Sequence, residues 1–219
     1  MPMPMPMPMR QVRAAFTDET ITVYQAYSPA IADAALRAGR FVAPFKRDRM
    51  TWIKPSFLWM MYRCGWATKP GQERVLAVAI TRDGFEWALS HSSLSYYEAG
   101  TYASEAEWAE RKAMSPVRVQ WDPERSLGLG PLDHRAIQVG LSGIAATHYV
   151  DDWIVGITDV TSTARDIANL VGHNVLAAAE NLLPAERPYP LPDHIARAVG
   201  AGRQETDEGS SPSSASTAS

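Results

Sequence analysis

Cationic and aromatic side chains are interleaved in one stretch, residues 46–63, which reads KRDRMTWIKPSFLWMMYR. Its five fixed positive charges belong to Lys46, Arg47, Arg49, Lys54 and Arg63. A cation buried without a partner costs on the order of several kcal/mol, so a plain buried helix would not carry them. The stretch therefore predicts an anionic partner for these side chains.

The surrounding region has the same electrostatic bias. Residues 40–82 contain nine Lys or Arg and two acidic residues, a net charge of +7 in a chain whose net charge is −3. Arg outnumbers Lys by 17 to 4 in the whole chain, which favours forked hydrogen bonds over point-charge contacts. A phosphate-bearing partner explains this pattern, and a solvated basic face is the alternative.

Two tryptophans and a helix start lie within the same stretch. Trp52 and Trp59 offer flat faces on which a planar ring can stack. Lys54 and Ser56 lie at a predicted helix N-terminus, where unpaired N–H groups attract anions. The alternative places both tryptophans in the core, extends Lys54 along the surface and makes Ser56 a simple helix cap.

Polar side chains also occur on predicted strands. They are Gln25 in one strand, Arg118, Gln120 and Asp122 on one face of another, and Gln138 in a third. Each of them can be explained as the solvent-facing side of a strand, but amides and guanidinium groups can also contact an amide, a base edge or a phosphate in a cleft. Asp122 is the candidate acid or base, with Glu124 as the alternate.

Several motifs of well-known enzyme classes are missing. The sequence has no GxGxxG, GxxxxGK[ST], HExxH or GxSxG, which argues against Rossmann, P-loop, zincin and serine-hydrolase chemistry. Its five histidines are scattered singly and Cys64 is its single cysteine, so we expect no metal site and no intrachain disulfide. We expect a cytoplasmic protein without a membrane span, since no apolar run approaches the length that a span needs.

Strands and helices are interspersed without regular alternation, which predicts an α+β fold rather than a doubly wound one. We expect strands at 10–16, 20–27, 74–82, 116–123 and 135–141, and helices at 28–39, 55–65, 84–91 and 104–114. Residues 149–160 and 162–183 are also predicted to be helical. The sheet is expected to be mixed or antiparallel, in one piece or split, and flanked by helices.

The chain is expected to divide into three parts. Residues 1–9 alternate Met and Pro, which excludes a helix or a central strand, so we expect a disordered extension. Residues 10–195 should form a single globular domain. Residues 196–219 end in a polar run and are expected to be a disordered tail.

Four segments carry a resemblance to a known family. They are RQVRAAFTDETITVYQAYSPAIADAAL, PFKRDRMTWIKPSFLWMMYRCGWATKPGQERVLAVAITRDGFEWAL, SPVRVQWDPER and RAIQVGLSG. Over roughly residues 10–192 the chain resembles the bacterial and fungal family known as domain of unknown function 4291. That resemblance implies a shared fold and no particular activity.

The order of elements is also similar to that of the ADP-ribosyltransferase superfamily, whose members bind NAD in a cleft of a split sheet. This resemblance implies that Gln25 and Tyr27 lie at the pocket and that Gln138 occupies the strand position where many members carry a catalytic Glu. Gln cannot act there as a carboxylate would. RNA phosphotransferases of the superfamily depend less on that Glu and more on Arg and His, which suits the Arg excess.

The leading hypothesis is therefore a nucleotide-handling transferase that uses NAD or acts on an RNA phosphate. We expect Arg47, Arg49, Lys54 and Arg63 to hold phosphates, Trp52 or Tyr27 to stack on a ring, and Gln25 and Gln138 to orient a ribose or nicotinamide; further ligand contacts are assigned to Ser56, Trp59, Gln120 and Arg135. A non-catalytic RNA- or nucleotide-binding module is the second hypothesis. A surface for a protein partner is the third.

Overall fold

The computed structural model describes residues 9–202, so the expectations for residues 1–8 and 203–219 lie outside the described part. A three-stranded antiparallel sheet has the order β2 (Thr20–Tyr27), β4 (Arg74–Thr81) and β8 (Ile154–Asp159). A four-stranded mixed sheet has the order β3 (Thr51–Ile53), β7 (Pro131–Leu141), β6 (Val117–Arg125) and β5 (Ser92–Leu94). A short pair joins β1 (Arg13–Ala14) to β9 (Arg187–Pro188). The predicted α+β class is confirmed.

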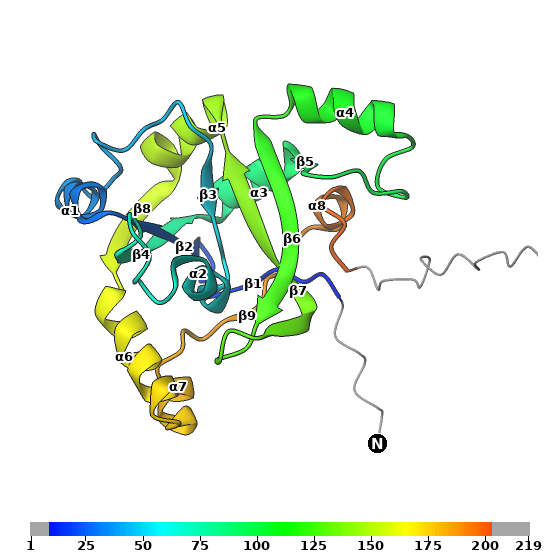
Figure 1. Ribbon diagram of the computed structural model, residues 1–219. Helices are drawn as coiled ribbons and strands as arrows, with labels where there is room; N and C mark the ends of the chain where they lie inside the picture. The colour runs from blue at the N-terminus through cyan, green and yellow to red at the C-terminus, as the bar shows by residue number, and fades with distance from the viewer. Residues whose placement is uncertain (1–8, 203–219) are drawn as a thin grey trace, which may run out of the picture.

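Helices surround the two larger sheets (Figure 1). They are α1 (Pro29–Ala38), α2 (Phe57–Cys64), α3 (Arg82–Ser90), α4 (Glu105–Met114), α5 (Gly143–His148), a π-helix (Tyr149–Trp153), α6 (Thr161–Gly172), α7 (Leu176–Asn181) and α8 (Asp193–Ala198). The last of these includes residues that were expected to belong to the tail. Within residues 9–202, no helix is long and apolar enough to cross a membrane.

The two sheets meet where β2 passes the end of β3. The N–H of Tyr24 donates to the carbonyl oxygen of Lys54 at 2.7 Å, and the N–H of Lys54 donates back to Tyr24 at 3.3 Å. After this bridge the sheets separate, so the end of β2 and the start of β3 face each other across a gap. The sheet is thus split, which was one of the expected forms.

The two best-marked helices begin and end as their sequences predict. Pro29 opens α1, and Gly39 ends it with φ of 66°. The hydroxyl of Ser56 accepts the N–H of Trp59 at 3.1 Å at the start of α2. Gly65 ends that helix with φ of 59°, a left-handed conformation that glycine adopts without the steric cost of a Cβ.

Strands β4 and β6 also match their patterns. β4 lies at the centre of its sheet, and most of its apolar side chains are buried. On β6, Val117, Val119 and Trp121 are buried, while the alternating polar side chains are half-buried. Of these polar residues, Gln120 lines the cleft described below, whereas Arg118 donates to the carbonyl oxygens of Lys112 and Ser115.

Three expectations are wrong or incomplete. Residues 149–160 form the π-helix and then β8, because the β-branched residues after Trp153 pair with β4. The first predicted strand is reduced to β1, and it meets β2 through a bridge between Phe16 and Ile21 while it pairs with β9. Strand β3 was not predicted, since three residues are too few for a visible periodicity.

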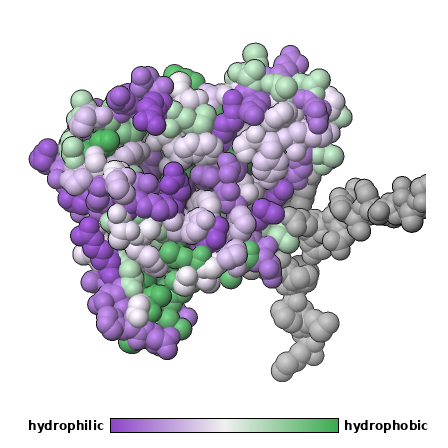
Figure 2. Space-filling view, in the orientation of Figure 1, coloured by the Kyte–Doolittle hydropathy of each residue, from purple (hydrophilic) through white to green (hydrophobic). Residues whose placement is uncertain are grey.

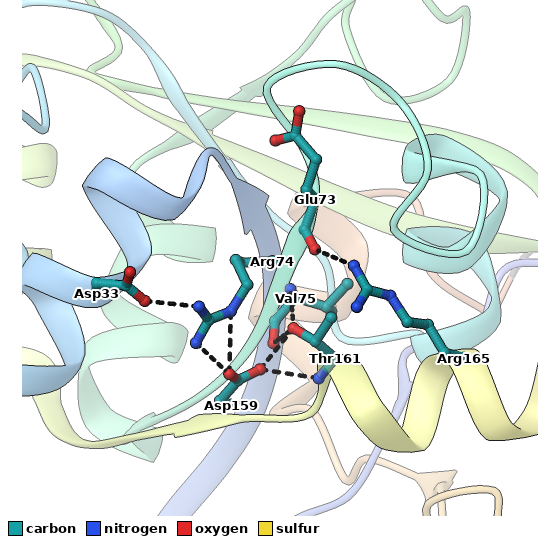
Figure 3. A network of polar contacts seen from close by, with 7 residues as sticks. All are labelled: Asp33, Glu73, Arg74, Val75, Asp159, Thr161 and Arg165. Atoms are coloured by element: carbon teal, nitrogen blue, oxygen red, sulfur yellow. Dashed lines mark hydrogen bonds and ion pairs between the residues drawn. The ribbon is translucent and has the colours of Figure 1, made fainter.

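A polar network ties the start of β4 to α1, β8 and α6 (Figure 3). Arg74 lies between Asp33, at 2.7 Å, and Asp159. The other oxygen of Asp159 accepts the N–H of Thr161 at 2.9 Å and so caps α6, and the hydroxyl of Thr161 accepts the N–H of Val75 at 2.9 Å. This network fixes the strand that follows the loop at residues 71–72, which lines the cleft.

Hydrophilic residues dominate the left and upper parts of the face shown in Figure 2, and the clearest hydrophobic patch lies below its centre. Most of the apolar core lies in a cluster that includes residues from both larger sheets. A second cluster lies between α2, α6 and α7 and contains Tyr24 and Phe57. The Tyr24 side chain, at the bridge between the sheets, therefore packs in this second, smaller apolar cluster.

Asp159→Ala should lower the free energy of unfolding by about 1–2 kcal/mol, since it removes a helix cap and an Arg74 contact. Burial opposes ionisation of Asp159, but hydrogen bonds from Thr161 and Arg74 outweigh it and hold its pKa below the ordinary value. Such a group stabilises the fold above its unfolded pKa, and this stabilisation is lost as pH falls through the lower folded pKa. Urea unfolding at pH 7 and pH 3 should show a deficit at pH 7 that shrinks at pH 3. The exposed Asp133→Ala serves as the control, and a deficit independent of pH would contradict the assignment.

Candidate functional site

A cleft of about 580 Å³ opens where the two sheets separate. Its walls come from the end of β2, from β3 and Lys54, from the loop at residues 44–50, from α2, and from the middle of β6 and β7. The cleft thus gathers side chains from segments more than a hundred residues apart. Its volume lies within the usual range for a small-molecule or cofactor site.

Four cations line this cleft, and we call them the cleft cations: Lys46, Arg49, Lys54 and Arg63. No Asp or Glu is among the residues that line it. Among the described residues, no carboxylate forms an ion pair with any of the four. The cleft therefore holds positive charge that the described part of the protein does not neutralise by direct pairing.

Lys54 is the most constrained of the cleft cations. It is 5% exposed, and its ammonium makes one long hydrogen bond, 3.5 Å, to the carbonyl oxygen of Trp52. Burial lowers its pKa to about 8, the positive charge of Arg63 adds to that effect, and Asp122 opposes it. An ammonium with three donors and one weak acceptor is left with unmet hydrogen-bonding capacity inside the cleft.

Two glutamines and a carboxylate form the opposite wall. Gln120 and Gln138 are paired across β6 and β7, and both line the cleft. The Nε2 groups of Gln120 and Gln138 donate to the two oxygens of Asp122, at 2.8 and 2.7 Å. Because a carboxylate only accepts hydrogen bonds, both amide oxygens are left as the acceptors that this wall can offer to a ligand.

The inner end of the cleft is built from a hydrogen-bonded group that we call the inner network: Gln25, Tyr27, Thr51 and Tyr149. Gln25 is 2% exposed, and its Nε2 lies 2.8 Å from Tyr27 Oη and 2.7 Å from Thr51 Oγ1. The Tyr149 hydroxyl donates to Gln25 Oε1 at 2.6 Å. Gln25 therefore positions its neighbours, and its own amide is already bonded at both ends.

Trp52 supplies the aromatic face of the cleft. It is half-buried and lies on β3, where it pairs with Gly140 of the neighbouring strand β7. A Cβ at residue 140 would lie 2.7 Å from Met50 Sδ and 3.0 Å from the Trp52 ring, so a larger residue there would force these side chains to shift. Tyr27 also lines the cleft, but its ring already packs edge-on against Phe41 and Phe45.

The structure brings together most of the residues that were singled out from the sequence. Those that line the cleft are Gln25, Tyr27, Arg49, Trp52, Lys54, Arg63, Gln120 and Gln138. Asp122 lies directly behind two of them. Their convergence was a requirement of the phosphate hypothesis, and whether they bind a ligand stays a prediction.

Four others lie outside the residues that line the cleft. Arg47 makes a bidentate ion pair with Asp151 of the π-helix, at 2.6 and 2.8 Å, on an exposed surface. Trp59 is 6% exposed and stacks on Tyr62, with the Arg125 guanidinium over both rings. Arg135 lies on β7 beyond the cleft, where its backbone N–H donates to the Met9 carbonyl oxygen.

Ser56 is the fourth predicted residue that does not line the cleft. The prediction of an anion site at the start of α2 is therefore wrong. Ser56 is buried and donates to Glu124 Oε1 at 2.9 Å. The N–H of Phe57 donates to Glu186 Oε1 at 2.7 Å. Two of the protein's own carboxyl groups therefore occupy the position that a ligand anion would need, and Glu124 serves as a structural partner of the helix start.

Sequence reasoning missed several residues of the site, among them Lys46 and Thr51, which line the cleft, and Tyr149, which supports its inner end. Lys46 was counted among the cations but not assigned to the site, and its place in the basic stretch was the available signal. Thr51 comes from the unpredicted strand β3. Tyr149 lies 124 positions from Gln25, within a segment expected to be helical, and no local pattern indicated that they meet.

Comparisons with known proteins identify the family and give no activity. A family model described as "Domain of unknown function (DUF4291)" matches residues 11–189. No curated protein matches the chain. Any function must therefore be argued from the cleft.

Glu186→Gln should stabilise the protein by about 2–4 kcal/mol more at pH 8 than at pH 5. Burial raises the pKa of Glu186 from 4.5 to about 8, and the nearby Glu124 adds to this. An acid whose folded pKa is raised makes the fold less stable as pH rises from its unfolded to its folded value. The amide cannot ionise, and its oxygen still accepts the N–H of Phe57.

Urea unfolding at pH 5, 6.5 and 8 measures this trend, with the exposed Glu180→Gln as the control. A stability difference from wild type that is the same at pH 5 and pH 8 would contradict it.

Proposed function

The chain belongs to the DUF4291 family, whose description names no activity, and we propose from the cleft itself that it is a nucleotide-handling transferase that binds NAD or an RNA phosphate. The observation that carries the proposal is the set of four cleft cations without a paired carboxylate among the described residues. Lys54 is buried, and a buried positive charge is unfavourable unless an anion meets it, whereas Lys46, Arg49 and Arg63 line the same cleft from exposed positions. A phosphate group is the biological anion that best suits a mixture of Arg and Lys donors.

The remaining lining residues suit the rest of a nucleotide. Trp52 offers an aromatic face on which a planar ring can stack. The amide oxygens of Gln120 and Gln138 can accept hydrogen bonds from sugar hydroxyls or from the amino groups of a base. The cleft thus has cations on one side and neutral acceptors on the other, and a nucleotide carries the complementary groups.

Transfer chemistry needs a group that can take a proton from the attacking nucleophile. Asp122 is the candidate, because it lies directly behind Gln120 and Gln138, which line the cleft. NAD, if it is the donor, would transfer its ADP-ribosyl group to the nucleophile as its glycosidic bond to nicotinamide breaks and nicotinamide leaves. The cleft cations would hold its phosphates, and Asp122 would accept the proton that the nucleophile releases.

A non-catalytic nucleotide- or RNA-binding module is the second candidate. The observation that favours it is that both oxygens of Asp122 already accept hydrogen bonds and that no carboxylate lines the cleft. Such a module would use the same cleft cations and the same aromatic face.

Thermal-shift measurements with NAD, ATP and a short RNA separate these possibilities. A ligand at 100 times its dissociation constant stabilises the fold by about 2.7 kcal/mol. Stabilisation by NAD together with release of nicotinamide supports NAD-dependent transfer, and a modified RNA end supports the phosphate-directed form. Stabilisation by RNA that weakens steeply with salt, without any product, supports the module. No response to any of the three would overturn both and favour a protein-partner surface.

Arg49→Ala should weaken binding of whichever nucleotide stabilises the protein by about tenfold or more, since it removes a charge-assisted hydrogen bond to phosphate. Isothermal titration calorimetry measures the change. Arg197→Ala, on the exposed end of α8, is the matched control and should leave affinity unchanged. Equal losses in the two variants would indicate a general effect of net charge and count against the cleft.

NAD affinity should fall as pH rises through 8. The bound diphosphate favours the charged form of Lys54, whose pKa in the unliganded protein is lowered to about 8. The ammonium is therefore present below pH 8 and is lost above it, which predicts a decrease of up to about tenfold between pH 7 and pH 9. Lys54→Arg should abolish this pH dependence, whereas Lys112→Arg on α4 should retain it. A wild-type profile that is flat between pH 7 and pH 9 would rule out a role for Lys54.

A further inference from the structure

The geometry of the inner network determines which of its atoms donate hydrogen bonds and which accept them. The first step is to assign the nitrogen and the oxygen of the Gln25 amide. Nε2 of Gln25 lies 3.3 Å from the carbonyl oxygen of Trp52. A backbone carbonyl only accepts hydrogen bonds, so the atom that faces it must be the nitrogen rather than the amide oxygen.

The orientation of Gln25 determines the direction of the next bonds. Its Oε1 can only accept, so the fully buried Tyr149 hydroxyl must donate to it at 2.6 Å. The two hydrogens on Nε2 serve its two shorter contacts, the hydroxyl oxygens of Tyr27 and Thr51 at 2.8 and 2.7 Å, and the longer contact to Trp52 shares one of them. Both hydroxyls therefore act as acceptors toward Gln25, and each still carries its own hydrogen.

Only one of these two hydrogens can be used inside the network. Tyr27 Oη and Thr51 Oγ1 lie 3.0 Å apart, so one hydroxyl donates to the other. Neither hydroxyl has a further acceptor among residues 9–202. One O–H donor is therefore left over, on Tyr27 or on Thr51, and both residues line the cleft.

We propose that the inner end of the cleft presents one hydroxyl donor, shared between Tyr27 and Thr51 and fixed in direction by Tyr149 through Gln25, which recognises an acceptor oxygen of the ligand. This inference rests on the proposed function, because it supposes that a ligand occupies the cleft. The recognised atom is a phosphoryl or carbonyl oxygen without a hydrogen of its own. Tyr149 is a positioning residue, since it acts through Gln25 and does not line the cleft.

The proposal predicts an unusual pattern of substitutions. Tyr27→Phe removes one hydroxyl, but the Thr51 hydroxyl then has no neighbour to donate to and can donate to the ligand. Thr51→Val leaves the Tyr27 hydroxyl in the same position. Each single variant therefore retains one donor, whereas the double variant Tyr27→Phe/Thr51→Val has none.

Isothermal titration calorimetry with NAD and with inorganic pyrophosphate tests this pattern. Each single variant should bind within about twofold of wild type, and the double variant should bind about tenfold or more weakly. Loss with both probes assigns the acceptor to a phosphoryl oxygen, and loss with NAD alone assigns it to another part of the dinucleotide. A double variant whose loss equals the product of the single losses would overturn the shared donor. Urea unfolding of all four proteins separates this coupling from a loss of fold.

A neutron diffraction structure of the wild-type protein in D2O tests the hydrogen count without any ligand. It should show the Gln25 deuterons directed at Tyr27 and Thr51, the Tyr149 deuteron directed at Gln25, and one hydroxyl deuteron directed into the cleft. Gln25 Oε1 facing Tyr27 and Thr51 would overturn the proposal. If neither probe binds the wild type, the NAD-dependent form of the proposed function fails, and this structure still decides the inference.

Discussion

The bridge between Tyr24 and Lys54 is the constraint on which the site depends. It joins the two larger sheets at one residue pair, and both backbone groups that Lys54 can offer are used in it. The Lys54 backbone cannot move away without breaking that junction. Its side chain is held in the cleft as a result, even though burial disfavours its charged form.

Carboxyl groups and cations occupy different places around α2. The start of the helix is already occupied by carboxyl groups from Glu124 and Glu186, which come from β6 and from the segment before β9. The N–H groups of Phe57 and Trp59 are therefore hydrogen-bonded within the protein. Anion affinity is left to the cleft cations, which lie on the loop at residues 44–50, directly after β3 and in the last turn of α2. The internal carboxyl groups hold the helix in place, and the unpaired cations remain available.

Local sequence patterns were sufficient for elements that carry their own signals. Helices α1 and α2 have start and stop residues within a few positions, and β6 alternates buried and half-buried side chains. The basic and aromatic stretch also indicated where much of the cleft would be. Each of these features is encoded within about a dozen residues, which is the range over which propensity and periodicity act.

The remaining features depend on contacts between distant segments. Strand β3 is recognisable only because β7 pairs with it. Residues 154–159 were misassigned as helical because they form β8 directly after the π-helix. Ser56 has the same cap signal whether its hydroxyl faces a ligand or Glu124, 68 positions away. The sequence could therefore name the kinds of side chain in the site, but it could not say which of them were already paired.

The polarity of the cleft argues against a simple inorganic anion as its ligand. A small anion would meet the cleft cations but would leave the amide oxygens of Gln120 and Gln138 and the face of Trp52 without partners. Unpaired acceptors in a partly desolvated cleft weaken binding, whereas a ligand with hydroxyl or amino donors and a planar ring satisfies them. A volume of about 580 Å³ also exceeds what one phosphate fills. The combination of anion, hydrogen-bond donors and ring within one molecule is what a nucleotide provides.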